Sequence, residues 1–131
     1  MSQIKYIPVS DVMEPNIPKI DGLTSIAEAI GKMKDANSGS LIVDKRDDRD
    51  EYGLISIGDL AANVISPDFA PERMSAYQVM NKPVISVESD MNIRYAIRLL
   101  TNFKISVALV VKQGKAVGLV RLRDMVFAYT E

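Results

Sequence analysis

The sequence contains one pattern of about sixty residues written twice in tandem, and this duplication constrains the fold more than any other feature. A shift of 67 positions superimposes four parts of the first copy on the second: Val12-Met13 on Val79-Met80, Ile26 on Ile93, Ala29-Ile30 on Ala96-Ile97, and Val43 on Val110. After Val43 the shift falls to 65, because the polar turn of the first copy is two residues longer, and Asp59 then matches Asp124. We therefore predict two repeats, residues 8–66 and 76–131, joined by a linker at 67–75.

Apolar spacing within each copy predicts the order strand, helix, strand, strand, helix. The first helices carry apolar stripes at Ile26, Ala29, Ile30 and Met33 and at Ile93, Ala96, Ile97 and Leu100. The predicted strands are 17–20, 41–43 and 52–57 in the first copy and 84–87, 108–111 and 116–122 in the second. A second helix is predicted to begin near Asp59 or Asp124. Each return strand carries a glycine, Gly53 or Gly118, where another backbone is expected to approach closely.

The size of each copy predicts that the two share a core. A unit of about sixty residues is marginal alone and cannot bury both faces of its own sheet. The composition, 47% hydrophobic and 25% charged, is that of a folded globular protein. We predict a mixed α/β (α+β) fold of two tandem β-α-β-β-α repeats packed about a pseudo-twofold axis, with a pair of related clefts between them.

Charge and hydropathy argue against nucleic acid and membrane as partners. The 16 basic and 17 acidic residues are interleaved, so no basic stripe is available to replace the counterions of a nucleic acid. The longest apolar stretch, Ile105 to Val111, is far too short to span a bilayer, and the first residues lack the apolar region of a signal peptide. We therefore expect a cytoplasmic protein.

The residue types that most often carry chemistry are missing. The chain has no cysteine and no histidine, which removes thiolate nucleophiles, the commonest general base and the usual zinc ligands. We predict no catalytic residues, no metal site and no obligatory cofactor, and hence no enzyme. The acidic run Asp47, Asp48, Asp50 and Glu51 is interspersed with arginines at a hairpin turn, and we expect all four side chains to face solvent.

The two matched aspartates invite a structural explanation first. Ser56 and Asp59 have the spacing of a capping box, in which each residue satisfies a backbone N–H of the other at the start of a helix. In the second copy Arg121 replaces the serine and breaks the box, yet Asp124 remains. An acid in the first turn of a helix is favoured by the helix dipole by about 0.3 to 1 kcal/mol.

Read together in order, the motifs resemble a tandem pair of cystathionine-β-synthase (CBS) domains, also called a Bateman module. The resembling segments are Val12-Met13 and Val79-Met80, Pro83-Val84-Ile85-Ser86-Val87, the two Ala-Ile helices, and the endings 53–60 and 118–125. They cover almost the whole chain. The resemblance implies a regulatory role without chemistry, a homodimer, an unknown protein partner, and an adenine nucleotide ligand such as AMP, ADP or ATP in the clefts.

The resemblance also assigns roles to particular residues. It implies that Asp59 and Asp124 contact the ribose, with Ser56 and Arg121 at the position of the family's hydroxyl residue. It places the segments Ile17-Pro18 and Val84-Ile85 beside the adenine. A carboxylate suits this task, because it can accept hydrogen bonds from both ribose hydroxyls.

Arg121 departs from the family pattern, and its consequence stays open. The guanidinium can reach a phosphate bidentately, fill the cleft, or pair with Asp124 and close the site. We expect the site with Ser56 and Asp59 to follow the family pattern more closely. The alternative to a ligand sensor is a dimerisation or protein-interaction module of the same fold with degenerate, non-binding clefts. Met13 and Met80 are predicted to fill gaps in the core.

Overall fold

The protein is described by a computed structural model over residues 5–82 and 84–130. Pro83, which belongs to one of the motifs above, and Glu131, the last residue of the second predicted repeat, lie outside the described residues. The chain forms two compact units. One, which we name the Asp59 unit, comprises residues 17–82 with Val84; the other, the Asp124 unit, comprises residues 5–16 with 85–130.

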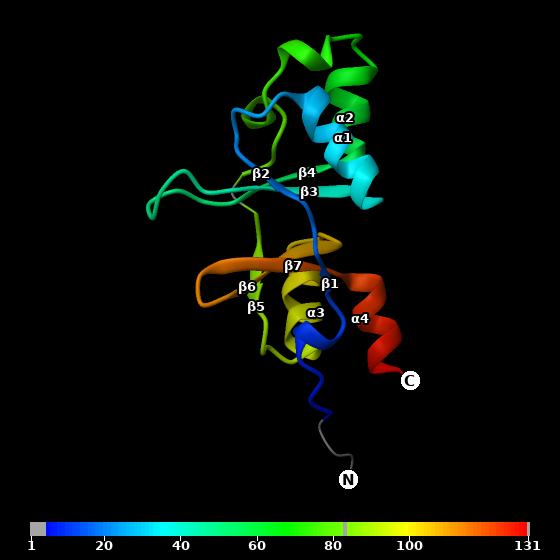
Figure 1. Cartoon of the computed structure of the whole chain (residues 1–131). Helices are drawn as coiled ribbons and strands as arrows, with labels where there is room; N and C mark the ends of the chain where they lie inside the picture. The colour runs from blue at the N-terminus through cyan, green and yellow to red at the C-terminus, as the bar shows by residue number, and fades with distance from the viewer. Residues whose placement is uncertain (1–4, 83, 131) are drawn as a thin grey trace. The chain divides into compact units, whose positions relative to one another are not determined.

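The Asp59 unit contains a three-stranded sheet and its helices (Figure 1). In chain order its elements are β2 (Lys19–Ile20), α1 (Ile26–Ala36), β3 (Ser40–Val43), β4 (Gly53–Ser56) and α2 (Ile57–Leu60). The central strand β3 pairs in parallel with β2 and antiparallel with β4. The α2 helix continues into a π-helical turn, Ala61–Ile65.

The apolar stripe of α1 forms the core of this unit as predicted. Ile26, Ala29 and Met33 are buried in one cluster with residues of β3 and β4. Burying a large aliphatic side chain contributes roughly 1.5 to 3 kcal/mol. The helix begins where the Ser25 hydroxyl accepts the Glu28 N–H at 3.1 Å.

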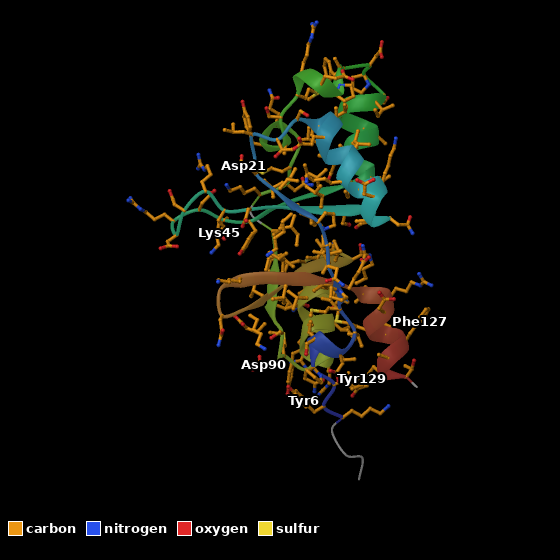
Figure 2. All side chains as sticks on the ribbon, viewed as in Figure 1. Tyr6, Asp21, Lys45, Asp90, Phe127 and Tyr129 are labelled. Carbon is orange, nitrogen blue, oxygen red and sulfur yellow. The ribbon has the colours of Figure 1, made fainter. Side chains whose placement is uncertain are left out.

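The Asp124 unit contains a four-stranded sheet in the order β1-β7-β6-β5. Its elements are β1 (Glu14–Pro15), β5 (Ser86–Glu88), α3 (Ile93–Asn102), β6 (Val107–Lys112), β7 (Lys115–Arg121) and α4 (Leu122–Tyr129). Ile93, Ala96 and Leu100 of α3 are fully buried in the core of this unit. The chain before β1 is fastened to the same unit, because the Tyr6 hydroxyl donates to the Asp90 carbonyl at 2.6 Å (Figure 2).

The compact units differ from the sequence repeats because the segments ahead of each first strand are exchanged. Glu14 of β1 pairs with Leu119 of β7, which belongs to the second repeat (Figure 1). Asn81 pairs in the same way with Leu54 of the first repeat, with N–H to carbonyl distances of 3.0 and 2.9 Å. Each unit is thereby completed by a segment of the other repeat, and the element order in each repeat did not predict this exchange.

A glycine lies at each place where an exchanged segment passes the return strand, as expected: Gly53 in β4 and Gly118 in β7. A Cβ atom on Gly53 would lie 2.6 Å from the Met80 Sδ, and one on Gly118 would lie 2.5 Å from the Glu14 carbonyl oxygen. Met80 and Met13 each pack against the core of their unit, which confirms them as core-filling residues. The close approach of the exchanged segment is the reason for glycine at these two positions.

The predicted fold class is confirmed: β2-α1-β3-β4-α2 in the first repeat and β5-α3-β6-β7-α4 in the second both have the order β-α-β-β-α, within a mixed α/β structure. The short strand β1 precedes this order in the first repeat. Within residues 5–82 and 84–130, none of the helices has the length and apolar character needed to cross a membrane.

Candidate functional site

Asp59 lies at the start of α2, where the chain leaves β4. The Ser56 hydroxyl accepts the Asp59 N–H at 3.2 Å, and the Asp59 Oδ2 accepts the Ser56 N–H at 2.8 Å. This is the capping box that the spacing predicted. The Ser56 hydroxyl also donates to the same Oδ2 atom at 2.9 Å. The structural role of Asp59 is therefore confirmed.

A third donor reaches the same carboxylate oxygen from the exchanged segment. The Asn81 amide nitrogen lies 2.9 Å from the Asp59 Oδ2. Three hydrogen bonds thus converge on one oxygen of a half-buried side chain. Within the described part of the chain, the other oxygen, Oδ1, has no hydrogen-bond partner. The carboxylate is therefore held in place through Oδ2, and Oδ1 remains available to accept a hydrogen bond.

The corresponding place in the Asp124 unit is built differently. Arg121 precedes α4 at the capping position and provides no side-chain cap. Its guanidinium forms an ion pair with Glu14 of the exchanged segment β1. The carboxylate of Asp124 has no hydrogen bond or ion pair among residues 5–82 and 84–130. The sequence suggested a phosphate or Asp124 as the partner of Arg121, but in the structure Arg121 pairs with Glu14.

Glu14 and Asn81 are the site residues that sequence reasoning missed. The shift of 67 positions that superimposes Met13 on Met80 also superimposes Glu14 on Asn81. We call the segments 53–60 and 118–125, which contain the two matched aspartates, the aspartate endings. Asn81 contacts Asp59 in the ending of its unit, and Glu14 contacts Arg121 in the ending of the other unit. The signal was therefore present in the repeat, as a pair of different polar residues next to a matched apolar pair.

The apolar residues predicted to flank the adenine begin the sheets of the two units. Ile17 is buried, and Pro18, Val84 and Ile85 are half-buried. The Pro18 carbonyl accepts the N–H of β3 at Ile42, and the Ile85 carbonyl accepts the N–H of β6 at Leu109, both at 2.9 Å. These bonds extend the parallel pairing beyond β2 and β5, so the segments have a structural role whether or not they contact a ligand.

A shallow pocket lies beside each aspartate ending. In the Asp59 unit it has a volume of about 370 Å³ and includes Gly39 and Ile57. In the Asp124 unit it has a volume of about 610 Å³ and includes Ser106 and Leu122. The two pairs are repeat-related, and in each the helix residue donates its N–H to the strand-side carbonyl, at 3.0 and 2.9 Å. Each unit therefore has open space next to its ending.

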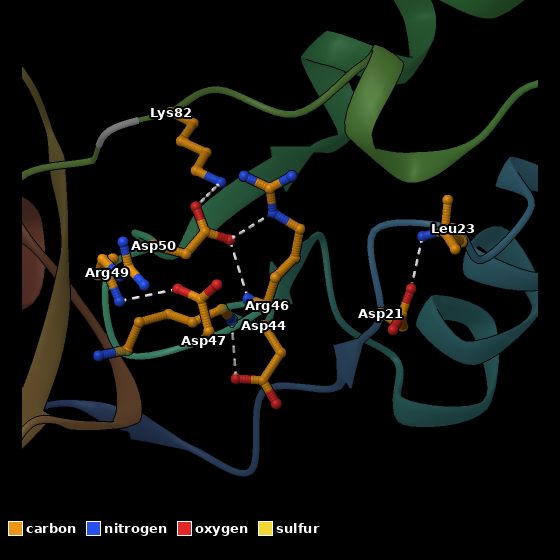
Figure 3. Close-up of polar contacts among 9 residues, drawn as sticks. Asp21, Leu23, Asp44, Arg46, Asp47, Arg49, Asp50 and Lys82 are labelled. Carbon is orange, nitrogen blue, oxygen red and sulfur yellow. Dashed lines mark hydrogen bonds and ion pairs between the residues drawn. The ribbon is translucent and has the colours of Figure 1, made fainter.

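The acidic run at the hairpin is not uniformly exposed, which corrects one prediction. Asp47, Asp48 and Glu51 are exposed, but the Asp50 side chain is only 6% exposed. Asp50 is held by an ion pair with Lys82 and by Arg46, whose Nε lies 3.1 Å away (Figure 3). The Lys82 ammonium first, and then the Arg46 backbone N–H, hold the pKa of Asp50 well below its usual range. Lys82 is remote in sequence, so the hairpin alone could not reveal this partner.

Among the described residues, no group of three or more acidic side chains is arranged to hold a metal ion.

Known proteins share both the sequence pattern and the fold. The family model for the CBS domain matches residues 9–66 and 76–131. Protein MK0525 of Methanopyrus kandleri is 27% identical over 123 residues, which is 93% of this chain and 62% of that protein. The chain thus spans less than two thirds of the length of this relative.

Solved structures agree with this assignment. The hexameric CBS-CP12 protein from bloom-forming cyanobacteria superimposes with a TM-score of 0.84 at 27% identity, covering 93% of this chain and 67% of the other. The CBS-domain pair of protein MJ0100, solved in complex with 5′-methylthioadenosine and S-adenosyl-L-methionine, gives a TM-score of 0.75 at 20% identity over 96% of this chain and 98% of the other. With both repeats matched and the fold shared, the chain belongs to the CBS-domain family and carries a tandem CBS pair.

Proposed function

We propose that this CBS pair is a regulatory module that binds an adenine nucleotide, AMP, ADP or ATP, with the ribose on Asp59. The observation that carries the proposal is the carboxylate of Asp59. Its Oδ2 is fixed by Ser56 and Asn81, and its Oδ1 has no partner in the described part of the chain. A ribose hydroxyl can donate to such a fixed carboxylate with little further ordering of the protein.

Two further observations support an adenosine ligand. A pocket of about 370 Å³ includes Ile57 and Leu60, the first and last residues of α2, although Ser56 and Asp59 are not part of its lining. Both ligands of the related protein MJ0100 contain an adenosine group. Because the chain has no cysteine or histidine, we propose that the module performs no catalysis itself. Nucleotide occupancy is instead passed to a protein partner, and we propose that the module acts as a homodimer.

The experiment is a calorimetric titration of the purified protein with AMP, ADP and ATP. We expect saturable binding that Asp59→Asn weakens at least tenfold, which corresponds to about 1.4 kcal/mol. The asparagine keeps the size of the side chain and one acceptor oxygen. Asp35→Asn, at an exposed position of α1, is the matched control and leaves affinity unchanged. The absence of saturable heat with all three nucleotides at millimolar concentration contradicts the proposal.

A specific observation favours the rival function for the Asp124 unit. The ion pair between Arg121 and Glu14 engages the guanidinium that a phosphate would otherwise meet. In this unit the Arg121 side chain instead links β7 to β1 through Glu14. If both aspartate endings were engaged in such internal contacts, the module would bind a protein partner without any ligand. Partner binding would then be the same with and without nucleotide.

A further inference from the structure

The Asp59 unit contains a second pocket whose lining includes neither Ser56 nor Asp59. Its volume is about 500 Å³, within the range of roughly 300 to 1,000 Å³ that is typical of small-molecule sites. The walls come from the residues that follow β2 and β3, from the hairpin between β3 and β4, and from the segment 77–82.

The walls are fixed by backbone hydrogen bonds. Ile20 of β2 lies opposite Val43 of β3 in a parallel pair, so Asp21 and Asp44 follow neighbouring strands at the same level. The Tyr77 N–H donates to the Gly22 carbonyl at 2.9 Å, which ties the segment 77–82 to the end of β2. The carboxyl ends of parallel strands are a common location for ligands in open sheets.

The pocket combines an apolar lining with exposed apolar residues. Val43 is buried and Met80 is half-buried. Leu23 is 78% exposed and Tyr77 is 53% exposed, although both are large and apolar. Exposed apolar side chains next to a pocket are typical of a binding site, since a ligand removes them from water.

The charges around the pocket are only partly compensated. Asp50 is neutralised by Lys82 and by the Nε of Arg46 (Figure 3). The Arg46 side chain is 82% exposed, and its terminal nitrogens have no hydrogen-bond partner within the described residues. Asp21 and Asp44 accept only the nearby N–H groups of Leu23 and Lys45, at 2.7 and 3.1 Å. In the described chain neither of these two carboxylates has a cationic partner.

We propose that this pocket binds an amphipathic zwitterion of the amino-acid type. The ammonium group pairs with Asp44 and Asp21, the carboxylate with the guanidinium of Arg46, and the apolar side chain covers Val43 and Tyr77. A guanidinium matches a carboxylate in geometry as well as charge. The lining carries three carboxylates and two cationic groups, a net charge of −1, which disfavours a polyanion such as a nucleotide.

The ligand class is tested by calorimetry on the whole protein with L-leucine and L-phenylalanine. N-acetyl-leucine lacks the ammonium charge and leucinamide lacks the carboxylate. We expect saturable binding of at least one amino acid and at least a tenfold loss of affinity with each blocked analogue, because each loses one charge-assisted contact. AMP should not compete, and Asp59→Asn should leave amino-acid binding unchanged.

Variants test the residues. Asp44→Asn and Asp21→Asn keep an acceptor oxygen for the local N–H groups and remove only the charge, so we expect about a tenfold loss of affinity in each. Arg46→Gln should have a similar effect. Asp48→Asn, at an exposed position of the same hairpin outside the pocket lining, is the control and should bind as the wild type does. The proposal is overturned if neither amino acid binds at about 10 mM, which is roughly tenfold above a Kd of 1 mM. It is also overturned if both aspartate variants bind as tightly as the wild type.

Discussion

Three aspartates, one in the hairpin between β3 and β4 and two in the first turns of α2 and α4, differ in the partners of their carboxylates. Asp50 is held by two cationic side chains, so its charge stabilises the hairpin. Asp59 is held by neutral donors on one oxygen. The carboxylate of Asp124 has no hydrogen bond or ion pair within the described chain, although Asp124 matches Asp59 in the repeat. Identity at matched positions therefore does not imply equal contacts.

Asp50 predicts a pH-dependent contribution to stability. Its pKa is lowered by Lys82 and Arg46, so the ionised form is favoured in the folded state. The stabilisation is present above the unfolded pKa of about 3.9 and is lost as the pH falls through the lower pKa of the folded protein. Asp50→Asn should therefore lower the unfolding temperature at pH 7, and the difference from wild type should shrink below about pH 4.

Thermal unfolding between pH 7 and pH 3 measures this difference. Asp48→Asn, in the same hairpin but exposed, should show no comparable difference at any pH. An Asp50→Asn variant that is as stable as wild type at pH 7, or equally destabilised at pH 7 and pH 3, would refute the assigned role of the ion pairs.

The Ser56 hydroxyl predicts a loss of stability on removal. Ser56→Ala removes the acceptor of the Asp59 N–H at the start of α2 and one donor to the Asp59 Oδ2. Loss of a helix N-cap costs about 1 kcal/mol in the free energy of unfolding. Urea unfolding should detect this loss, and Ser66→Ala, an exposed position beyond the cap, should not change stability measurably. Equal stability of the two variants would contradict the capping role.

At the scale of elements, the exchanged segments predict unequal effects of two matched glycines. In Gly118→Ala the new methyl group meets the Glu14 carbonyl oxygen, which is backbone and cannot move without disturbing β1. In Gly53→Ala it meets the Met80 Sδ, which is flexible. Overpacking costs about 1 to 3 kcal/mol, and we expect Gly118→Ala to lie in that range and Gly53→Ala below it.

Chemical denaturation of both variants provides the comparison. Gly31→Ala is the control of opposite sign, because Gly31 lies within α1 with no atom in the way of a Cβ, and alanine is favoured there by about 0.5 to 1 kcal/mol. Equal destabilisation by Gly53→Ala and Gly118→Ala would show that the exchanged segments do not pack against the two return strands as described.

The helices and strands of each repeat could be predicted because their signals are local. The stripe Ile26, Ala29 and Met33 fixes the buried face of α1 by its spacing alone, and the structure buries it. The exchange could not be predicted in this way. It pairs Glu14 with Leu119, far apart in sequence, through a strand of only two residues that includes a proline. A strand of two residues is too short to show the alternation of apolar and polar residues by which strands are predicted.

At the scale of the whole molecule, duplication has produced two units with one architecture and two different polar endings. In the Asp59 unit the exchanged segment contributes an amide, Asn81, that supports the aspartate. In the Asp124 unit it contributes a carboxylate, Glu14, that pairs with Arg121. The sequence predicted this inequality from Ser56 and Arg121, but not its partners, because they arrive from the other repeat. We therefore expect the two endings to differ in ligand affinity.

The number of nucleotides bound per chain tests this account most directly. Equilibrium dialysis measures it with whichever of radiolabelled AMP, ADP or ATP binds most tightly in the calorimetric titration, at saturating concentration, with Asp59→Asn and Asp124→Asn as the paired variants. We predict one nucleotide per chain in the wild type, one in Asp124→Asn, and a large loss of binding in Asp59→Asn. Two equivalent sites per chain, or loss of binding in Asp124→Asn with binding retained in Asp59→Asn, would contradict it.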